Sequence, residues 1–369
     1  MKMKTKILIG IPPKNHINLA MDEVQGLTDL GYDCDTIVYT RNKPFAGKID
    51  KLLGVLANAF ALVKRLYNFK PNMIYLNSRF EPVGTTRDFI TILLIRLLYW
   101  HKLNIAIKTH GSDLSILTKK SFFFDSLVIP YLSKQVTLWF FLSHEEKNNI
   151  AKLAPKFAEK AYVTGNIIDP NRSIKSEAFL SAHGLNDNRF KFFFAGRMIA
   201  EKGIFSIIRA IPHFKYKEDC VFIFAGNGEE YDEFKAEIKS LQIEKYVHLT
   251  GFLPEEECDH FYANSDALVF PTYFDEGFPM ALFKSIGCGL PVITTQTRAA
   301  IDHLKEPDNC LWVNGKDSQS VKKALTMIYE SDELRNKMRK NNLVLGQNFT
   351  KRKITEQMHQ DFIKATVSN

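Results

Sequence analysis

Short runs of β-branched and aromatic residues alternate with helix-length amphipathic segments along the whole 369-residue chain. This alternation is typical of βαβ units and predicts an α/β protein built on parallel sheets. Because the chain is too long for one ordinary hydrophobic core, we expect two domains. The predicted strands are residues 7–11, 35–39, 73–77, 105–109, 136–142, 190–195, 220–225, 247–250, 267–270 and 291–294.

The domain boundary is predicted in the turn-rich segment 165–172, between a weak strand and a predicted helix at 174–183. The N-terminal domain would be residues 1–172 and the C-terminal domain residues 173–349. A last amphipathic helix, about 350–369, follows the second domain. In parallel sheets ligands bind outside the carboxyl ends of the strands, so we expect function in the polar turns that follow them.

The charge is unevenly distributed. Residues 1–172 contain 24 Lys and Arg against 14 Asp and Glu, a net charge of +10, whereas residues 173–369 carry −2. This excess fits either ordinary solvated lysines or attraction to an anionic membrane or diphosphate. The basic residues follow no recognisable nucleic-acid-binding motif, so no nucleic-acid partner is expected.

The cysteines and the hydrophobic segments indicate the compartment. The five cysteines form no Cys-x-x-Cys pair, which argues against a zinc site or disulfides and suits a reducing cytoplasm. The most hydrophobic window, residues 89–100, is shorter than the roughly 20 residues that span a bilayer. The N-terminal apolar run is too short for a signal peptide. We expect a cytoplasmic protein, either soluble or peripheral on the inner face of the plasma membrane.

The segment from Glu276 to Thr295 is the most informative for function. An acidic residue in a Gly/Pro turn precedes a short helix pattern, which ends at Gly287 and Gly289 and leads into a β-branched strand. A helix that starts after such a turn presents free backbone N–H groups and a positive dipole end. It is therefore suited to hold a phosphate, with Gly277 and Phe278 in the turn.

Two cations follow an earlier strand. Arg197 and Lys202 stand about five residues apart across a turn and a helix start. Such a pair can converge on one anion, with Arg binding in a bidentate manner and Lys as a point charge. Taken alone, such a pair would be interpreted as two exposed loop cations.

Together these segments resemble the family 4 retaining glycosyltransferases. The resemblance rests on Gly196-Arg197 with Glu201-Lys202-Gly203 and on the segment that begins at Glu276; it covers nearly the whole second half and is patchy in the first. It implies the GT-B fold, in which two Rossmann-like domains with parallel sheets face a central cleft and the last helix crosses back to the first domain. It also implies that Arg197 and Lys202 hold the donor diphosphate and that Glu276 accepts hydrogen bonds from the transferred sugar.

Lys284 departs from the family pattern, which has a second Glu at this position to take the ribose hydroxyls. An ammonium group can donate to a hydroxyl but cannot accept from it. Three interpretations stay open. Lys284 approaches the diphosphate or leaves room for water at the ribose, the nucleotide binds in a shifted pose, or the chain has lost catalysis.

In the first half, His110 opens a His-Gly-Ser-Asp turn that resembles the family's His-Gly-x-Asp loop, whose His contacts the donor sugar. Asp113 in this turn is expected to cap the following helix. The first loop departs from the family, because Pro12-Pro13 replaces a Gly-Gly pair. We place Pro13, Lys14 and Glu81 on the acceptor side.

The donor and the mechanism follow from the resemblance. Gly251, Phe252 and Leu253 resemble a segment that flanks the nucleobase, and they do not decide between UDP- and GDP-linked sugars. Fixed cations and a helix start would stabilise the departing diphosphate, so neither a metal nor another cofactor is expected. The family is thought to use front-face attack, in which the leaving phosphate oxygen takes the acceptor proton.

The acceptor is predicted to be a glycan carried on a polyisoprenoid diphosphate, as in bacterial O-antigen or capsule assembly. Apolar helices among the basic residues of the first half favour peripheral contact with an anionic membrane. Two other functions stay open. One is a GT-B sugar-nucleotide epimerase, which would need no acceptor, and the other is a non-catalytic protein that binds nucleotide sugars.

Overall fold

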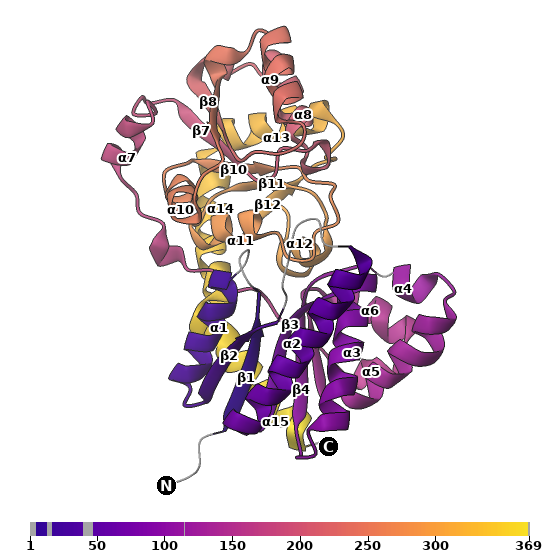
Figure 1. Ribbon diagram of the computed structural model, residues 1–369. Helices are drawn as coiled ribbons and strands as arrows, with labels where there is room; N and C mark the ends of the chain where they lie inside the picture. Colours follow the sequence, from indigo (N-terminus) through magenta and orange to yellow (C-terminus); the bar gives the residue numbers. More distant parts are fainter. Residues whose placement is uncertain (1–4, 13–16, 40–46, 114, 368–369) are drawn as a thin grey trace. The chain divides into compact units, whose positions relative to one another are not determined.

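The computed structural model describes residues 5–12, 17–39, 47–113 and 115–367, and the chain divides into two compact units. Unit 1 is Met1–Ile167 with Lys351–Asn369, and unit 2 is Ile168–Thr350. Each unit is a parallel sheet covered by helices (Figure 1).

The sheet of unit 1, sheet A, has the strand order β2-β1-β3-β4-β5-β6 within the described residues. Its strands are β1 (Lys6–Ile11), β2 (Asp33–Val38), β3 (Met73–Phe80), β4 (Asn104–Ser112), β5 (Leu138–Phe141) and β6 (Ala161–Val163). Its helices are α1 (Ile17–Asp29), α2 (Lys48–Phe69), α3 (Pro82–Leu98), α4 (Ser115–Thr118), the π-helix η1 (Phe123–Val128), α5 (Ile129–Gln135), α6 (His144–Leu153) and α15 (Lys351–Val367).

The sheet of unit 2, sheet B, has the order β12-β11-β10-β7-β8-β9 within the described residues. Its strands are β7 (Phe190–Ala195), β8 (Cys220–Ala225), β9 (Val247–Gly251), β10 (Ala267–Phe270), β11 (Val292–Thr294) and β12 (Cys310–Trp312). Its helices are α7 (Glu177–Ala182), α8 (Ile204–Ala210), α9 (Tyr231–Ser240), α10 (Glu255–Ala263), α11 (Met280–Gly287), α12 (Arg298–His303), α13 (Ser318–Glu330) and α14 (Asp332–Gly346).

Burial explains why these runs form parallel strands. All six residues of β8 are buried, as expected for a strand that is covered on both faces and therefore reads as a continuous apolar run. In unit 1 one core joins the strands to α2, α3 and α5, and the other side of the sheet packs with α1 and α15. The predicted parallel α/β architecture is confirmed.

The division between the units falls after Ile167, whereas the sequence predicted it after Arg172. Residues 168–172 belong to unit 2 because the Ile168 N–H donates to the Phe349 carbonyl at 2.9 Å and the turn 170–172 packs on α10. The predicted helix 174–183 is shorter, since the Ser176 hydroxyl caps α7 by accepting from the Phe179 N–H.

Sheet B has a topological switch point where β7 lies next to β10. From β7 the chain continues to β8 and β9 on one side, and from β10 it continues to β11 and β12 on the other. The corresponding place in sheet A is between β1 and β3. Ligands of such sheets bind outside the carboxyl ends of the strands at the switch point. We therefore expect a ligand of unit 2 to bind at the loops after β7 and β10.

Candidate functional site

The loop after β7 is held against the loop after β10 by backbone contacts. The Glu201 carbonyl accepts from the N–H groups of Tyr273 at 2.7 Å and Phe274 at 2.9 Å. Gly203 has a φ of 78°, and a Cβ there would lie 2.2 Å from the Pro271 carbonyl oxygen, so this close approach requires glycine. The two loops at the switch point thus form one interlocked structure.

This interlocking places Lys202 against Glu276. Their side chains form an ion pair and are only 12% and 15% exposed. The Lys202 ammonium also lies 4.8 Å from the centre of the Phe274 ring. A cation and a carboxylate from different loops therefore meet at the switch point, as expected if both act on one ligand.

Arg197 is the more accessible cation of this edge. Its side chain is 49% exposed and its Nη1 lies 3.8 Å from Glu229 Oε1, which is long for an ion pair. Its guanidinium lies 5.5 Å from the centre of the Phe274 ring, the ring that Lys202 also contacts. The fork of donors is therefore oriented by an aromatic face and remains accessible to an anion.

The turn before α11 is closely packed. Gly277 and Phe278 are buried, and the Phe278 ring stacks on Phe283 with the ring centres 3.7 Å apart. Phe278 also meets the edge of Phe349, with the ring centres 5.5 Å apart. This packing fixes where α11 begins, and hence where its first N–H groups point.

Lys284 is paired with two carboxylates of α10. Its Nζ lies 2.6 Å from Asp259 Oδ1 and 2.8 Å from Glu255 Oε1. Burial alone would lower the pKa of Lys284, but the pairing with Asp259 and Glu255 raises it. Burial raises the pKa of Asp259, and Lys284 opposes that rise. Both carboxylates thus pair with the one ammonium group.

The segment expected at the nucleobase follows β9 directly. Gly251 ends the strand with a φ of 71°. Phe252 is 77% exposed and Leu253 is half-buried. An exposed aromatic ring at the carboxyl end of a strand is available for stacking.

In unit 1, His110 lies near the end of β4, and its Nε2 lies 2.7 Å from Asn77 Oδ1. The Asn77 amide donates in turn to the Gly10 carbonyl at 3.1 Å. Asp113 accepts from the N–H of Ser115, the first residue of α4, at 2.9 Å, and hydrogen bonds from the Ser115 side chain and backbone lower the pKa of the aspartate. Residues 110–112, expected in a turn, continue β4, and the hydrogen bond to Asn77 of the neighbouring strand β3 holds the imidazole.

Of the three residues predicted on the acceptor side, the structure describes Glu81. Pro13 and Lys14 lie outside the described residues. Glu81 precedes α3, and its Oε1 lies 3.8 Å from Arg79 Nη1 at the surface. Nothing in these contacts assigns Glu81 a chemical task.

The sequence did not identify several polar residues at these edges. Asp88 is fully buried, accepts from the Tyr39 hydroxyl at 2.7 Å and pairs with Arg87 at 2.9 Å. Arg298 is an ion-pair partner of Asp275 beside Glu276. Tyr39 is far from Asp88 in the sequence, and Asp275 is far from Arg298, so the sequence pattern does not connect these partners. Only Arg87 and Asp88 are adjacent.

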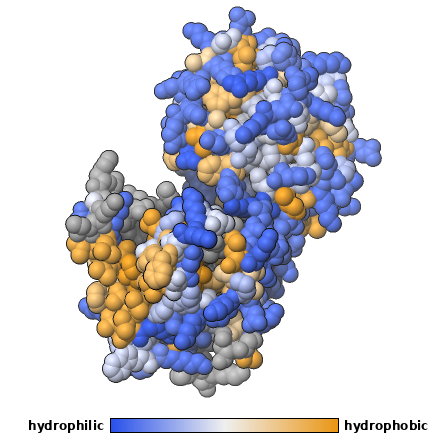
Figure 2. Space-filling model, turned by 90° about the vertical axis from the view of Figure 1, so that its right-hand side faces the viewer, coloured by the Kyte–Doolittle hydropathy of each residue, from blue (hydrophilic) through white to orange (hydrophobic). Residues whose placement is uncertain are grey.

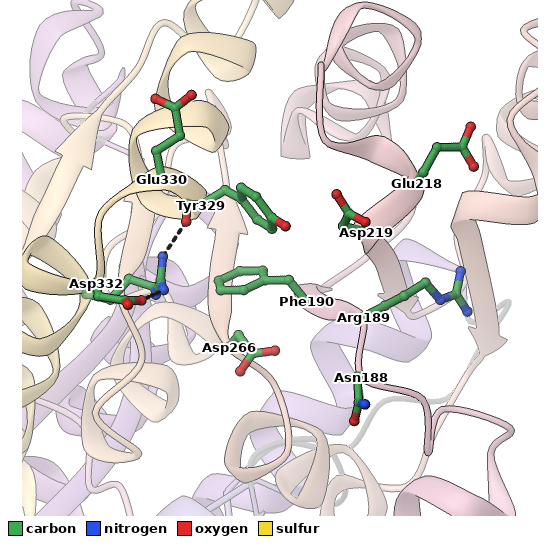
Figure 3. A pocket seen from close by; sticks show the side chains of 10 residues that line it. Asn188, Arg189, Phe190, Glu218, Asp219, Asp266, Tyr329, Glu330 and Asp332 are labelled. Atoms are coloured by element: carbon green, nitrogen blue, oxygen red, sulfur yellow. Dashed lines mark hydrogen bonds and ion pairs between the residues drawn. The ribbon is translucent and has the colours of Figure 1, made fainter.

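A cavity of about 690 Å³ lies at the other end of sheet B (Figure 3). Its lining includes the start of β7 and the residues before β8 and β10, all at the amino ends of these strands. The cavity is therefore distinct from the switch-point residues. Among the described residues, no group of three or more His, Cys, Asp or Glu side chains is arranged to hold a metal ion.

Comparison with known proteins shows which family part of this chain resembles. Residues 175–343 match the family described as Glycosyl transferases group 1. An uncharacterized glycosyltransferase of Methanocaldococcus jannaschii is 25% identical over 39% of this chain and 36% of its own length. A putative teichuronic acid biosynthesis glycosyltransferase of Bacillus subtilis is 27% identical over 38% and 33%. These matches span about a third of each relative's length.

Solved structures show the fold. The Anabaena protein HepE in complex with UDP and glucose is 16% identical, with a TM-score of 0.74 over 98% of this chain and 100% of that one. At this identity the likeness shows the fold alone, and the fold is GT-B, with two Rossmann-like domains. The matched segment of the family lies within unit 2 and contains Arg197, Lys202, Glu276 and Lys284.

Proposed function

We propose that this chain is a family 4 retaining glycosyltransferase that moves a sugar from a UDP- or GDP-linked donor to a glycan acceptor. The observation that carries the proposal is the meeting of Arg197, Lys202 and Glu276 at the switch point of sheet B. The match to the glycosyl transferases group 1 family over the same unit supports it.

The chemical step breaks the bond between the anomeric carbon and a phosphate oxygen and forms one between that carbon and an acceptor hydroxyl oxygen, so negative charge develops on the leaving diphosphate. Arg197 and Lys202 stabilise this charge, and in the front-face mechanism the leaving oxygen takes the acceptor proton. When the diphosphate attracts Lys202, Glu276 can accept hydrogen bonds from the sugar. His110 is assigned to the transferred sugar on the strength of the resemblance.

The two cations are proposed to act in place of a divalent metal, and no other cofactor is assigned. Incubation with EDTA should therefore leave the transfer rate unchanged. A loss of rate that Mg²⁺ or Mn²⁺ restores would contradict this part of the proposal.

The proposed acceptor is a glycan on a polyisoprenoid diphosphate at the cytoplasmic face of the plasma membrane, in assembly of an O-antigen or another surface polysaccharide. The B. subtilis relative, whose name places it in teichuronic acid biosynthesis, supports this class of product. A lipid-linked acceptor requires the enzyme to work at a membrane surface.

Unit 1 offers a surface for such contact. We call it the apolar surface, and it consists of exposed side chains on α2, at the start of α3 and in and beside η1, elements that pack side by side. They are Leu52, Leu53, Phe60, Val83, Phe122, Phe123 and Leu127. Figure 2 shows hydrophobic residues gathered on one side of this unit. Exposed Lys51, Lys119 and Lys120 belong to the same elements or flank them, which suits anionic lipid.

No described helix is long and apolar enough to cross a membrane. The membrane proposal is therefore one of surface binding. Co-sedimentation with phosphatidylglycerol vesicles should fall as salt rises, because exposed charges are screened. Phe122→Ser should weaken it, whereas the control Val344→Ser, at an exposed position of α14 in unit 2, should not. Equal effects of both variants would contradict the assignment of this surface.

The proposed reaction is tested by incubating the protein with a panel of UDP- and GDP-sugars and lipid-linked acceptors. We expect nucleoside diphosphate release that depends on an acceptor, and a product whose anomeric configuration matches the donor in NMR spectra. Release of free sugar from a UDP-sugar without acceptor would indicate an epimerase instead. Donor binding without turnover would indicate a non-catalytic binding protein.

A further inference from the structure

The ion cluster between α10 and α11 has unequal members. Lys284 contacts both Glu255 and Asp259, and its side chain is 16% exposed. The Asp259 side chain is 4% exposed, whereas that of Glu255 is 41% exposed. Asp259 is therefore buried, and Glu255 is the carboxylate of the cluster that a ligand can reach.

The charge of the cluster selects the kind of ligand. Two carboxylates face one ammonium group, so the cluster keeps a net negative charge when all three members are ionised. Such a site repels a phosphate and favours a neutral group that donates hydrogen bonds. A carboxylate offers about four lone-pair sites, so Glu255 can accept from a hydroxyl while Oε1 stays bound to Lys284.

The position of Glu255 at the start of α10 also bears on which ligand group it can contact. It opens α10 four residues after Gly251, and exposed Phe252 lies between them. Lys284, which holds Glu255, lies on α11, the helix that follows Glu276 and the proposed diphosphate loop. Along the carboxyl edge of unit 2 the cluster thus connects the segment assigned to the nucleobase with the helix assigned to the diphosphate. In a nucleotide, the ribose joins the base to the diphosphate.

We propose that Glu255 accepts hydrogen bonds from the ribose hydroxyls of the donor nucleotide and that Lys284 acts as a positioning residue that holds its carboxylate. This inference rests on the proposed function, because it concerns the nucleotide of the same donor. In this assignment Lys284 does not contact the diphosphate, and recognition of the ribose is retained through Glu255.

The inference is tested by calorimetric titration of UDP and GDP, and of their 2′-deoxy and 2′,3′-dideoxy forms, into wild type and Glu255→Gln. Gln keeps the size of the side chain and removes its charge. The matched control is Glu256→Gln, an exposed carboxylate on the same first turn of α10. Thermal unfolding of each variant verifies the fold.

We expect Glu255→Gln to weaken binding of the preferred ribonucleotide about tenfold, the effect of losing a charge-assisted hydrogen bond. The dideoxy nucleotide should bind wild type and Glu255→Gln equally, since it has no hydroxyl for Glu255 to recognise. Lys284→Met should also weaken the ribonucleotide more than the dideoxy form. Glu256→Gln should change neither.

Two results would overturn the inference while leaving the proposed function intact. One is equal binding of the ribonucleotide by wild type and Glu255→Gln. The other is an equal loss for ribonucleotide and dideoxy nucleotide, which would show that the cluster only joins α10 to α11. Failure of folded wild type to bind either UDP or GDP would instead overturn the proposed function, and the ribose assignment with it.

Discussion

The carboxyl edges of the two sheets use their charged residues differently. In unit 2, the Glu201 carbonyl joins two loops by accepting from the N–H groups of Tyr273 and Phe274, and Arg197 remains half exposed. At the same edge of unit 1, Asp88 is fully buried and is neutralised by Arg87. Pairing with Asp88 raises the pKa of Arg87 against the effect of its burial. The half-exposed Arg197 of unit 2 stays available to a ligand, whereas the buried Asp88 of unit 1, paired with Arg87, stabilises the fold.

The family match lies in one of these two units. Residues 175–343 fall within unit 2, whose edge carries the cations expected for a diphosphate. Unit 1 contains His110, which is hydrogen-bonded to Asn77, and it has Pro12 where many members of the family that it resembles have glycine. The comparison predicts that variants in unit 1 chiefly change stability and that variants at the edge of unit 2 chiefly change binding or turnover.

The largest expected effect concerns Lys108, a buried residue of β4 in unit 1. Its Nζ lies 2.6 Å from Glu23 Oε1, and both side chains are almost fully buried. Lys108→Met would leave the Glu23 carboxylate buried and unpaired, so unfolding in urea should show a loss of about 3–5 kcal/mol. The control Lys6→Met breaks a surface pair with Asp33 and should lose less than about 1 kcal/mol. Equal losses would show that internal pairing does not stabilise unit 1.

The next effect concerns catalysis in unit 2. Glu276→Gln should lower the transfer rate about 10- to 100-fold, because a carboxylate that accepts from the sugar is lost. Nucleoside diphosphate affinity should stay unchanged or increase, since Lys202 is released from its ion pair. The control Glu201→Gln changes an exposed side chain whose backbone carbonyl does the bonding, and it should leave both quantities unchanged. A parallel loss of affinity and rate in Glu276→Gln would show that Glu276 does not recognise the sugar.

The smallest effect concerns Asp361 on α15, in unit 1. Burial raises the pKa of Asp361 to about 6, and Lys364 and Lys147 partly oppose the rise. The native state therefore binds more protons than the unfolded state between about pH 4 and 6, and the stability contribution of this group falls as pH rises through that window. Because the side chain is only half-buried, Asp361→Asn should stabilise the protein by no more than about 1 kcal/mol at pH 7. It should have no effect near pH 4, and urea titrations at both pH values verify this; an equal gain at both would contradict it.

Much of the fold could be predicted from the sequence because buried strands leave an unambiguous apolar run. Residues 190–195 and 220–225 were predicted as strands with the bounds that β7 and β8 have. The short strand β12 was not predicted, because three residues, Cys310–Trp312, are too few for a pattern. The helix 174–183 was drawn too long, because its apolar spacing begins before the Ser176 cap.

The candidate site could be predicted only for residues that lie in segments with a recognisable motif. Arg197, Lys202 and Glu276 were expected together because their segments resemble those of the family 4 glycosyltransferases, and the structure brings Lys202 to Glu276. The partners of Lys284 were not predicted, because α10 and α11 become neighbours only through the order of strands in sheet B. Glu255 and Asp259 are four residues apart and so share one face of α10, but this spacing alone does not name the cation that they bind.

The central claim is that the switch point of sheet B holds a nucleoside diphosphate, and Arg197 tests it most directly. Calorimetric titration of UDP and GDP should compare wild type with Arg197→Ala and with Arg189→Ala. Arg189 lies at the amino end of the same sheet beside Asp187, so its loss removes the same charge from the opposite edge. We predict an affinity about 10- to 100-fold weaker for Arg197→Ala and unchanged for Arg189→Ala. Unchanged affinity in folded Arg197→Ala, or an equal loss in both variants, would contradict the claim.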